Sequence, residues 1–214
     1  RGTFSTATAA SSIHSCNTCP PGKKSQVLGA NNSQVCVPCE IGKASGSGAI
    51  VCTNCVAGKY QNTRGNGNCI SCMPGTRNVL EGSTECLECT AGRASKTSNN
   101  DQLKCDTCVP GRYQSSNGQT TCLSCQPGRY TNEFGASICK NCAKNYFAMA
   151  SRSSLCIPCL KGRYTASTGQ SDCVSCAAGR YGTNASIDLS ELISQERCEK
   201  CPLGYKRAEE DEDL

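Results

Sequence analysis

Apolar side chains are scattered thinly along this 214-residue chain, and the polar stretches between them show no 3.6-residue period. Segments such as residues 130–133, Tyr-Thr-Asn-Glu, lie between two glycines and are too short for helices. The pattern predicts a repeating series of a turn, a short strand, a second turn and a short returning strand. Residues 187–196 are the exception, because Leu189, Leu192 and Ile193 have helical spacing and predict one short helix.

Eleven Cys-x-x-Cys pairs recur along the chain and contain all 22 cysteines. The steps from one pair to the next are 20, 16, 17, 17, 19, 17, 17, 17, 17 and 25 residues. A nearly fixed period of this size is typical of stacked copies of one small unit. The sequence therefore predicts an N-terminal extension (1–15), a tandem array of eleven repeats of about 17 residues (16–205) and an acidic C-terminal tail (206–214).

Glycine recurs at two positions of the repeat. In the pattern Cys-x-x-Gly-Lys/Arg-Tyr, the glycine is present in ten of eleven repeats and is replaced by Asn145 in the other. Because both residue types tolerate a positive φ, this position predicts a turn, of type II where proline precedes the glycine. A second glycine lies four residues before the next pair in six of ten intervals: Gly48, Gly65, Gly82, Gly118, Gly135 and Gly169.

The composition rules out a conventional hydrophobic core. Leu, Ile, Val and Phe total 30 of 214 residues and tryptophan is absent, which is too little apolar surface to oppose chain entropy. Cysteine compensates, because a disulfide that closes a loop of roughly 15 residues stabilises by about 3 kcal/mol in the chain-entropy model. We therefore expect a small disulfide-rich, mostly β fold of short hairpins, an elongated tandem-repeat rod with little regular secondary structure. Each repeat is expected to contact only its neighbours in sequence.

Such disulfides predict a secreted, extracellular or cell-surface location. Asn31 and Asn184 begin Asn-x-Ser sequons and are candidate N-glycan acceptors. The chain has neither a signal peptide nor an apolar run of membrane-spanning length and starts at Arg1, so we interpret it as a processed or partial piece of a longer protein. The net charge is +5, and the acidic run at residues 209–213 leaves the rest of the chain basic.

Two side-chain series allow both a binding and a structural interpretation. The aromatic residues that follow Gly-Lys/Arg could form an exposed binding ladder, but we favour rings that cover the disulfides. They are Tyr60, Tyr113, Tyr130, Phe147, Tyr164 and Tyr181. The preceding basic residues could bind acidic glycans, but a solvated face is the preferred interpretation. They are Lys23, Lys43, Lys59, Arg93, Arg112, Arg129, Arg163 and Arg180.

The cysteine motif also fits other chemistry. Two pairs could supply a zinc Cys₄ site, which we keep as a minor alternative, whereas a thioredoxin-type motif needs a βαβ context that is missing. The single histidine, His14, lies in a polar segment, and no catalytic motif is recognisable. We expect neither an enzyme nor a cofactor.

The pattern Cys-x-x-Cys-x-Pro-Gly-Arg/Lys-Tyr with a central glycine resembles the cysteine-rich repeats of ephrin-receptor and tumour-necrosis-factor-receptor ectodomains. It is similar above all to long tandem arrays of such repeats in surface proteins of algae, ciliates and other protists. The resemblance covers residues 16–205 and implies the fold far more than the function, because such repeats occur in receptors, coat proteins and appendage proteins alike. Kinase, death and transmembrane segments are absent from this sequence, so the resemblance does not imply signalling.

Two functions follow as hypotheses. The first is a structural or interaction module, a rod in a cell-surface, filament or appendage protein, part of a larger assembly. Its partners would be other protein subunits or extracellular glycans, with no nucleic acid and no membrane span in this segment. The alternative is a ligand-binding ectodomain fragment of a receptor. The near-uniform repeats favour the first hypothesis.

Two disulfide schemes fit the cysteine pairs. One joins the first cysteines and the second cysteines of two neighbouring pairs, as in Cys16–Cys36 with Cys19–Cys39, and requires intervals that alternate in character. Because the intervals do not alternate, we favour a ladder between consecutive pairs, although connectivity is not strictly readable from sequence. The ladder leaves the partners of Cys16 and Cys201 open. It uses Cys19, Cys36, Cys39, Cys52, Cys55, Cys69, Cys72, Cys86, Cys89, Cys105, Cys108, Cys122, Cys125, Cys139, Cys142, Cys156, Cys159, Cys173, Cys176 and Cys198.

Overall fold

The computed structural model describes residues 1–8, 12–96, 103–182 and 198–204. The predicted helix at 187–196, the sequon at Asn184 and the acidic tail lie outside these residues. Contacts divide the chain into two units, each described by itself. The first comprises Arg1–Thr107 and Ser116–Thr121, and the second comprises Cys108–Ser115 and Cys122–Leu214.

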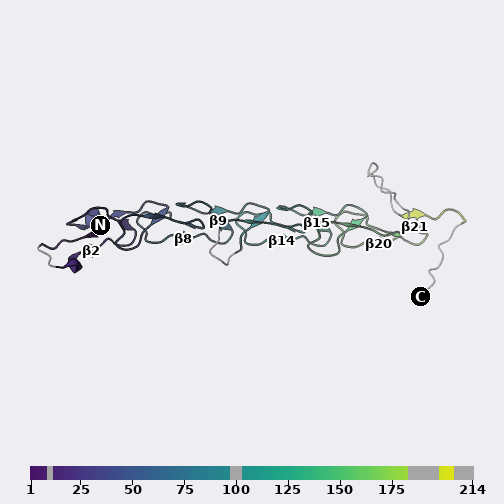
Figure 1. The fold of residues 1–214 in the computed structure, drawn as a ribbon. Helices are drawn as coiled ribbons and strands as arrows, with labels where there is room; N and C mark the ends of the chain where they lie inside the picture. The colour runs from purple at the N-terminus through teal and green to yellow at the C-terminus, as the bar shows by residue number, and fades with distance from the viewer. Residues whose placement is uncertain (9–11, 97–102, 183–197, 205–214) are drawn as a thin grey trace. The chain divides into compact units, whose positions relative to one another are not determined.

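Each unit consists of two-stranded antiparallel hairpins that succeed one another in chain order (Figure 1). The first unit contains β1 (Thr3–Phe4), η1, a 3₁₀ helix (Ile13–Ser15), β2 (Asn17–Thr18), β3 (Lys23–Lys24), η2, a second 3₁₀ helix (Ser33–Val35), β4 (Val37–Pro38), β5 (Lys43–Ala44), β6 (Thr53–Asn54), β7 (Lys59–Tyr60), β8 (Ile70–Ser71), β9 (Thr76–Arg77), β10 (Leu87–Glu88), β11 (Arg93–Ala94) and β12 (Asp106–Thr107). The second contains β13 (Arg112–Tyr113), β14 (Leu123–Ser124), β15 (Arg129–Tyr130), β16 (Lys140–Asn141), β17 (Tyr146–Phe147), β18 (Ile157–Pro158), β19 (Arg163–Tyr164), β20 (Val174–Ser175), β21 (Arg180–Gly182) and β22 (Cys198–Lys200). The predicted fold class, disulfide-rich tandem repeats of short β-hairpins, is confirmed.

The returning strand of almost every hairpin is the x-x dipeptide of the next Cys-x-x-Cys pair. In the hairpin of β7 and β8, Lys59 pairs with Ser71 and Tyr60 pairs with Ile70, between Cys69 and Cys72. The cysteine motif is therefore itself a strand, flanked on both sides by sulfur. The sequence pattern predicted strands between the cysteine pairs, so this double use of the motif was not predicted.

The turn after each pair has the backbone that its glycine predicts. In the turn Val56–Lys59, the amide of Lys59 donates to the carbonyl of Val56 at 3.0 Å, and Gly58 has φ of 80°. The equivalent glycine has a positive φ in all ten repeats that carry it. Asn145 has φ of 65° at the eleventh, which confirms that the position selects a left-handed backbone rather than a small side chain.

Backbone hydrogen bonds join each interval to the next, where an interval is the segment between two successive cysteine pairs. The Gly58 amide donates to the carbonyl of Asn78 at 2.8 Å, and its carbonyl accepts from the amide of Cys72 at 2.9 Å. In the reverse direction, the amide of Gly82 donates to the carbonyl of Cys55 at 2.7 Å. Since the same three bonds recur along the chain, the stacking depends on backbone groups rather than on side-chain identity.

The expectation that a repeat contacts only its sequence neighbours is wrong. A Cβ atom at Gly75 would collide with the backbone carbonyl of Gly118, which lies two intervals further along the chain. Gly22 has the same relation to Gly65. The turn glycine is therefore needed twice, once for its left-handed φ and once because another backbone packs directly against its α-carbon. We call the second turn, which contains this packing carbonyl, the distal turn.

The interior of the fold is made of cysteine sulfur, small or polar side chains and backbone. In the described residues, every buried apolar side chain is a cysteine or an alanine. No helix in the described part of the chain is long and apolar enough to cross a membrane.

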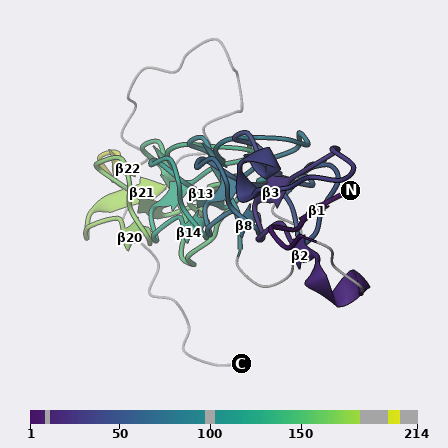
Figure 2. The same ribbon diagram turned by 90° about the vertical axis from the view of Figure 1, so that its left-hand side faces the viewer.

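Residues before the first cysteine pair also take part in the fold. Strand β1, in the segment expected to be an N-terminal extension, pairs with β2 of the first cysteine pair (Figure 2), with Thr3 opposite Thr18 and Phe4 opposite Asn17. The Gly2 amide donates to the carbonyl of Ser25 at 2.8 Å, the bond that turn glycines make elsewhere.

The two roles of the turn glycine can be separated by one pair of variants. Gly162→Ala should cost about 1 kcal/mol, because its φ is 76° but no atom of the described residues lies within 4 Å of the new Cβ. Gly75→Ala, at φ of 77°, should cost a further 1–3 kcal/mol, roughly, because the new methyl group meets the Gly118 backbone. Urea unfolding with the disulfides intact measures both, and equal costs would contradict the packing role.

Candidate functional site

The repeated structural centre of the molecule is a disulfide at the base of each hairpin. Ten disulfides join the second cysteine of one pair to the first cysteine of the next, with Cα–Cα distances of 5.5–5.8 Å and sequence separations of 13–22 residues. The structure thus has the consecutive pairing, from Cys19–Cys36 to Cys176–Cys198. Cys16 is exposed, Cys201 is half-buried, and both are free thiols.

A buried polar side chain accompanies most disulfides, and the sequence analysis missed it. It occupies the sixth residue after the second cysteine of a pair, which we call the sixth position, immediately after the aromatic residue in the repeats that have one. Aligning the repeats on that cysteine would have exposed the signal, because eight of ten intervals have Ser, Thr, Asn or Gln there. The buried residues are Ser25, Ser45, Gln61, Asn78, Ser95, Gln114, Thr131 and Thr165.

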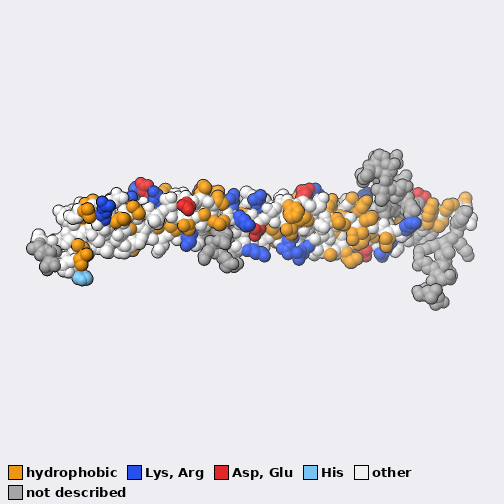
Figure 3. All heavy atoms as spheres, viewed as in Figure 1, with side chains coloured by type: hydrophobic (Ala, Val, Ile, Leu, Met, Phe, Trp, Pro, Cys, Tyr) orange, Lys and Arg blue, Asp and Glu red, His pale blue; other side chains and the backbone are white. Residues whose placement is uncertain are grey.

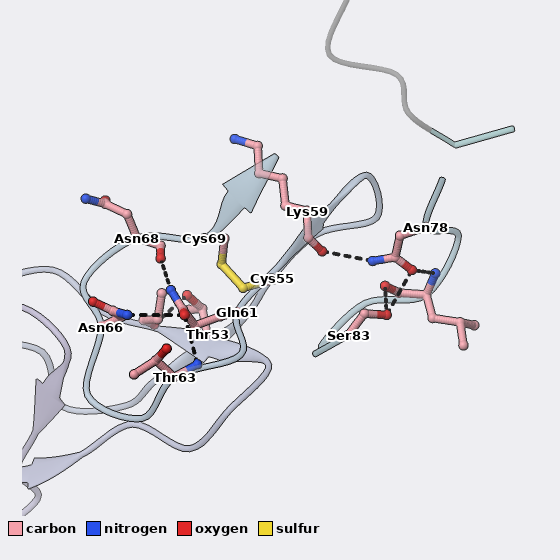
Figure 4. The surroundings of a disulfide bond; sticks show 12 residues. Thr53, Cys55, Lys59, Gln61, Thr63, Asn66, Asn68, Cys69, Asn78 and Ser83 are labelled. Carbon is pink, nitrogen blue, oxygen red and sulfur yellow. Dashed lines mark hydrogen bonds between the residues drawn. A yellow bond between two sulfur atoms is a disulfide. The ribbon is translucent and has the colours of Figure 1, made fainter. Parts of the chain in front are cut away.

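Gln61 shows how this position closes an interval (Figure 4). Its side chain is 1% exposed and lies beside the Cys55–Cys69 disulfide. The amide nitrogen donates to the carbonyl of Asn68 at 2.6 Å, while the carbonyl oxygen accepts from the Thr63 amide at 3.0 Å and from Asn66 Nδ2 at 3.2 Å. One carboxamide therefore holds the loop between the two cysteines in a single shape.

Asn78 makes an equivalent set of bonds in the next interval and also reaches the previous one. Its Nδ2 donates to the carbonyl of Lys59 at 2.8 Å, and its Oδ1 accepts from the Leu80 amide at 2.9 Å and from Ser83 Oγ at 2.8 Å. In the interval that contains Thr165, the hydroxyl accepts from the amide of Asn145 at 2.7 Å. The sixth position thus joins neighbouring repeats as well as closing its own.

The first x of the Cys-x-x-Cys pair presents a side chain to solvent in every described repeat. Several of these residues are apolar and lie opposite the aromatic residue of the hairpin, as Ile70 does for Tyr60 and Ile157 does for Phe147. The aromatic residues themselves are half-buried, except Tyr181, which is 41% exposed. Figure 3 shows the result, apolar side chains beside Lys and Arg on the face in view. Whether the rings cover the disulfides stays a prediction.

Charged side chains form few contacts in the described residues. Lys140 Nζ donates to Glu133 Oε1 at 2.6 Å, and this hydrogen bond, with the charge of the carboxylate, raises the pKa of Lys140. Tyr181 donates to Glu199 Oε2 at 3.0 Å, and that hydrogen bond raises the pKa of the Tyr181 hydroxyl. Both pairs are exposed, so water screens them and they contribute little to stability.

Metal binding would need thiolates that the disulfides have consumed. In residues 1–8, 12–96, 103–182 and 198–204, no three His, Cys, Asp or Glu side chains lie close enough together to hold a metal ion. His14 lies exposed in η1 and Asn31 lies exposed just before η2. Chemically, the arrangement offers a surface that disulfides hold in a fixed shape.

One family model matches this chain, described as tyrosine-protein kinase ephrin type A/B receptor-like. It matches three consecutive segments, residues 42–89, 92–142 and 145–186, about two-thirds of the chain. No curated protein matches the chain. Each matched segment spans cysteine pairs, turn glycines and sixth positions of the kind described above.

Reduction and chelation should have opposite effects on this fold. A thiol reductant should abolish the native circular-dichroism and proton NMR signals, because the hairpins then lose their only covalent closure. A strong chelator should leave both unchanged. Unfolding by the chelator alone, or about one zinc per two cysteine pairs by elemental analysis, would contradict a disulfide-based fold.

Loss of the Gln61 carboxamide should destabilise the fold strongly. Gln61→Ala removes a side chain that is 1% exposed and that bonds the Thr63 amide and the Asn68 carbonyl, so we expect a cost of about 1–3 kcal/mol in urea unfolding. Gln126→Ala is the matched control, because Gln126 is exposed beside a turn, and should change stability by less than about 0.5 kcal/mol. Similar costs for the two variants would show that the buried network has no special role.

Proposed function

The chain belongs to the ephrin type A/B receptor-like family of cysteine-rich repeats, and on that premise we propose that it is a non-enzymatic extracellular structural and interaction module. Its repeats are of a non-catalytic module type, and its many disulfides suit the oxidising space outside the cell. We place it in a cell-surface, filament or appendage protein, as one stretch of a larger assembly.

The observation that carries the proposal is the uniform use of the backbone. The turn amide, the turn carbonyl and the distal-turn amide make the same bonds in interval after interval, and the packing carbonyl lies against the α-carbon of a turn glycine two intervals away. A scaffold of this kind can be lengthened one repeat at a time without redesign. This favours a spacer that holds binding surfaces apart, an elongated rod, over a single specialised site.

Exposed side chains supply the contacts with partners. Apolar residues such as Leu87 and Leu123 are 57% and 47% exposed, and Leu87 lies opposite the half-buried Arg77 in its hairpin. Mixed surfaces of this kind suit other protein subunits, and the lysines and arginines could also contact acidic extracellular glycans. The exposed sequon at Asn31 is the one candidate N-glycan site within the described residues, and we propose that it is modified in the secreted protein.

A second candidate is the ligand-binding ectodomain of a receptor, which the description of the matched family favours. In that case, one or two repeats would carry the ligand contacts and the others would position them. The two candidates differ in self-association, because a receptor fragment binds a foreign ligand whereas a structural module binds copies of its own assembly.

Small-angle scattering and sedimentation test the proposal together. A compact domain of 214 residues would have a radius of gyration near 17 Å from the usual size scaling, and we expect a clearly larger value for a rod. Sedimentation at increasing concentration should show reversible association that weakens when exposed Leu87 and Leu123 are replaced by Asn. A compact value would contradict the spacer function, and a strictly monomeric rod would favour the receptor fragment.

A further inference from the structure

Gly2 has every feature of a turn glycine, although no cysteine pair precedes it in the sequence. Its φ is 74°, and a Cβ atom there would collide with the carbonyl of Gly48 in the second interval after its own. Its amide donates to Ser25 at 2.8 Å, and its carbonyl accepts from the amide of Cys19 at 2.9 Å. In the other repeats, a residue with these contacts is the third residue after the second cysteine of a pair.

We propose that the N-terminal edge of the first unit is built to receive one further cysteine, two residues before Arg1, and that this cysteine forms a disulfide with Cys16. The position follows from Gly2, which fixes where the second cysteine of its pair must lie. Cys16 is the first cysteine of the next pair, and this is the partner in all ten disulfides of the structure. On this proposal, the thiol of Cys16 is exposed because the cysteine that would bond to it lies before Arg1.

Gly29 points independently to the same missing residue. The amide of Ser5 donates to the carbonyl of Ala30 at 2.9 Å, which identifies Gly29, with φ of 66°, as the glycine of a distal turn. Distal-turn glycines elsewhere donate to the carbonyl of the second cysteine of the preceding interval, as Gly48 does to Cys19 at 2.8 Å.

For Gly29, the equivalent acceptor is the cysteine two residues before Arg1. Among the described residues, the Gly29 amide has no acceptor, and a Cβ atom there would meet nothing within 4 Å. The sulfur of Cys16 and the amide of Gly29 lie on different loops. A cysteine at this one position would supply the partner that each of them lacks among the described residues. The consequence is that the array can continue through this edge with unchanged geometry.

The reaction is ordinary thiol–disulfide exchange. The thiolate of one cysteine attacks a small-molecule disulfide such as oxidised glutathione and releases one glutathione thiol. The second cysteine then attacks the mixed disulfide and releases the other. Two protein thiols are oxidised to one disulfide, and one glutathione disulfide is reduced to two thiols.

Short N-terminal extensions test the site directly. Four chains are refolded with a glutathione redox couple. One has no extension, and the others have Cys-Ala, Ser-Ala or Cys-Ala-Ala-Ala-Ala before Arg1. Alkylation and mass spectrometry then count accessible thiols. The Cys-Ala chain should have one free thiol, two fewer than the three that the ten-disulfide ladder alone would leave, with a Cys16 cross-linked peptide, whereas the Ser-Ala chain should keep Cys16 reactive.

Hydrogen exchange at Gly29 separates a built site from mere proximity. We expect exchange of the Gly29 amide to slow at least tenfold in the Cys-Ala chain, because its acceptor carbonyl is then fixed in place. The longer extension can cross-link to Cys16 through its slack but should leave Gly29 unprotected. A reactive Cys16 in the Cys-Ala chain, or equal Gly29 exchange in the Cys-Ala chain and the longer extension, would overturn the proposal. Neither result would bear on the proposed function.

Discussion

The disulfide at the base of each hairpin is the constraint on which the other features depend. A pair of two-residue strands is far too short to be stable in water by itself. The sulfur bridge keeps the two ends of the interval together, which lets an inter-strand register as short as that of β7 with β8 persist. It also places the turn at a fixed distance from the next strand, since the turn residue, glycine or Asn145, always lies three residues after the cysteine.

With the ends fixed, the repeats can stack through their backbones. Turn glycines remove the side chain that would separate one backbone from another, as at Gly75, and the amides of Gly58 and Gly82 reach carbonyls of adjacent intervals. Polar backbone groups inside so small a body need partners, because leaving one unpaired costs about as much as a typical hydrogen bond contributes. The buried side chains at the sixth position supply those partners. A polar interior is therefore the consequence of a fold that buries backbone rather than aliphatic surface.

Sequence reasoning identifies the parts of this fold that need a particular residue. Cysteine periodicity predicts the array, and Asn145 in place of glycine correctly indicates a left-handed backbone. It misses Arg152, which has φ of 67° at a distal turn where most repeats have glycine, because the residue type there gives no hint of its backbone. It also misses the sixth position, because Ser, Thr, Asn and Gln usually indicate exposed loops. The contact between Gly75 and Gly118 could not be predicted either, since it depends on how two intervals stack around a third.

Separating the residues that hold the repeat from those that face solvent explains how such an array acquires a function. The first x of the pair can be Thr53, Ile70, Leu87 or Lys140 without any change in the strand that contains it. In the proposed interaction module, specificity would therefore depend on several neighbouring repeats together, because one exposed residue per hairpin is too small a surface for recognition. Such a surface has no need of a deep pocket or of shifted catalytic pKa values. For the interaction module proposed above, selectivity would come from the order in which nearly identical units present different side chains.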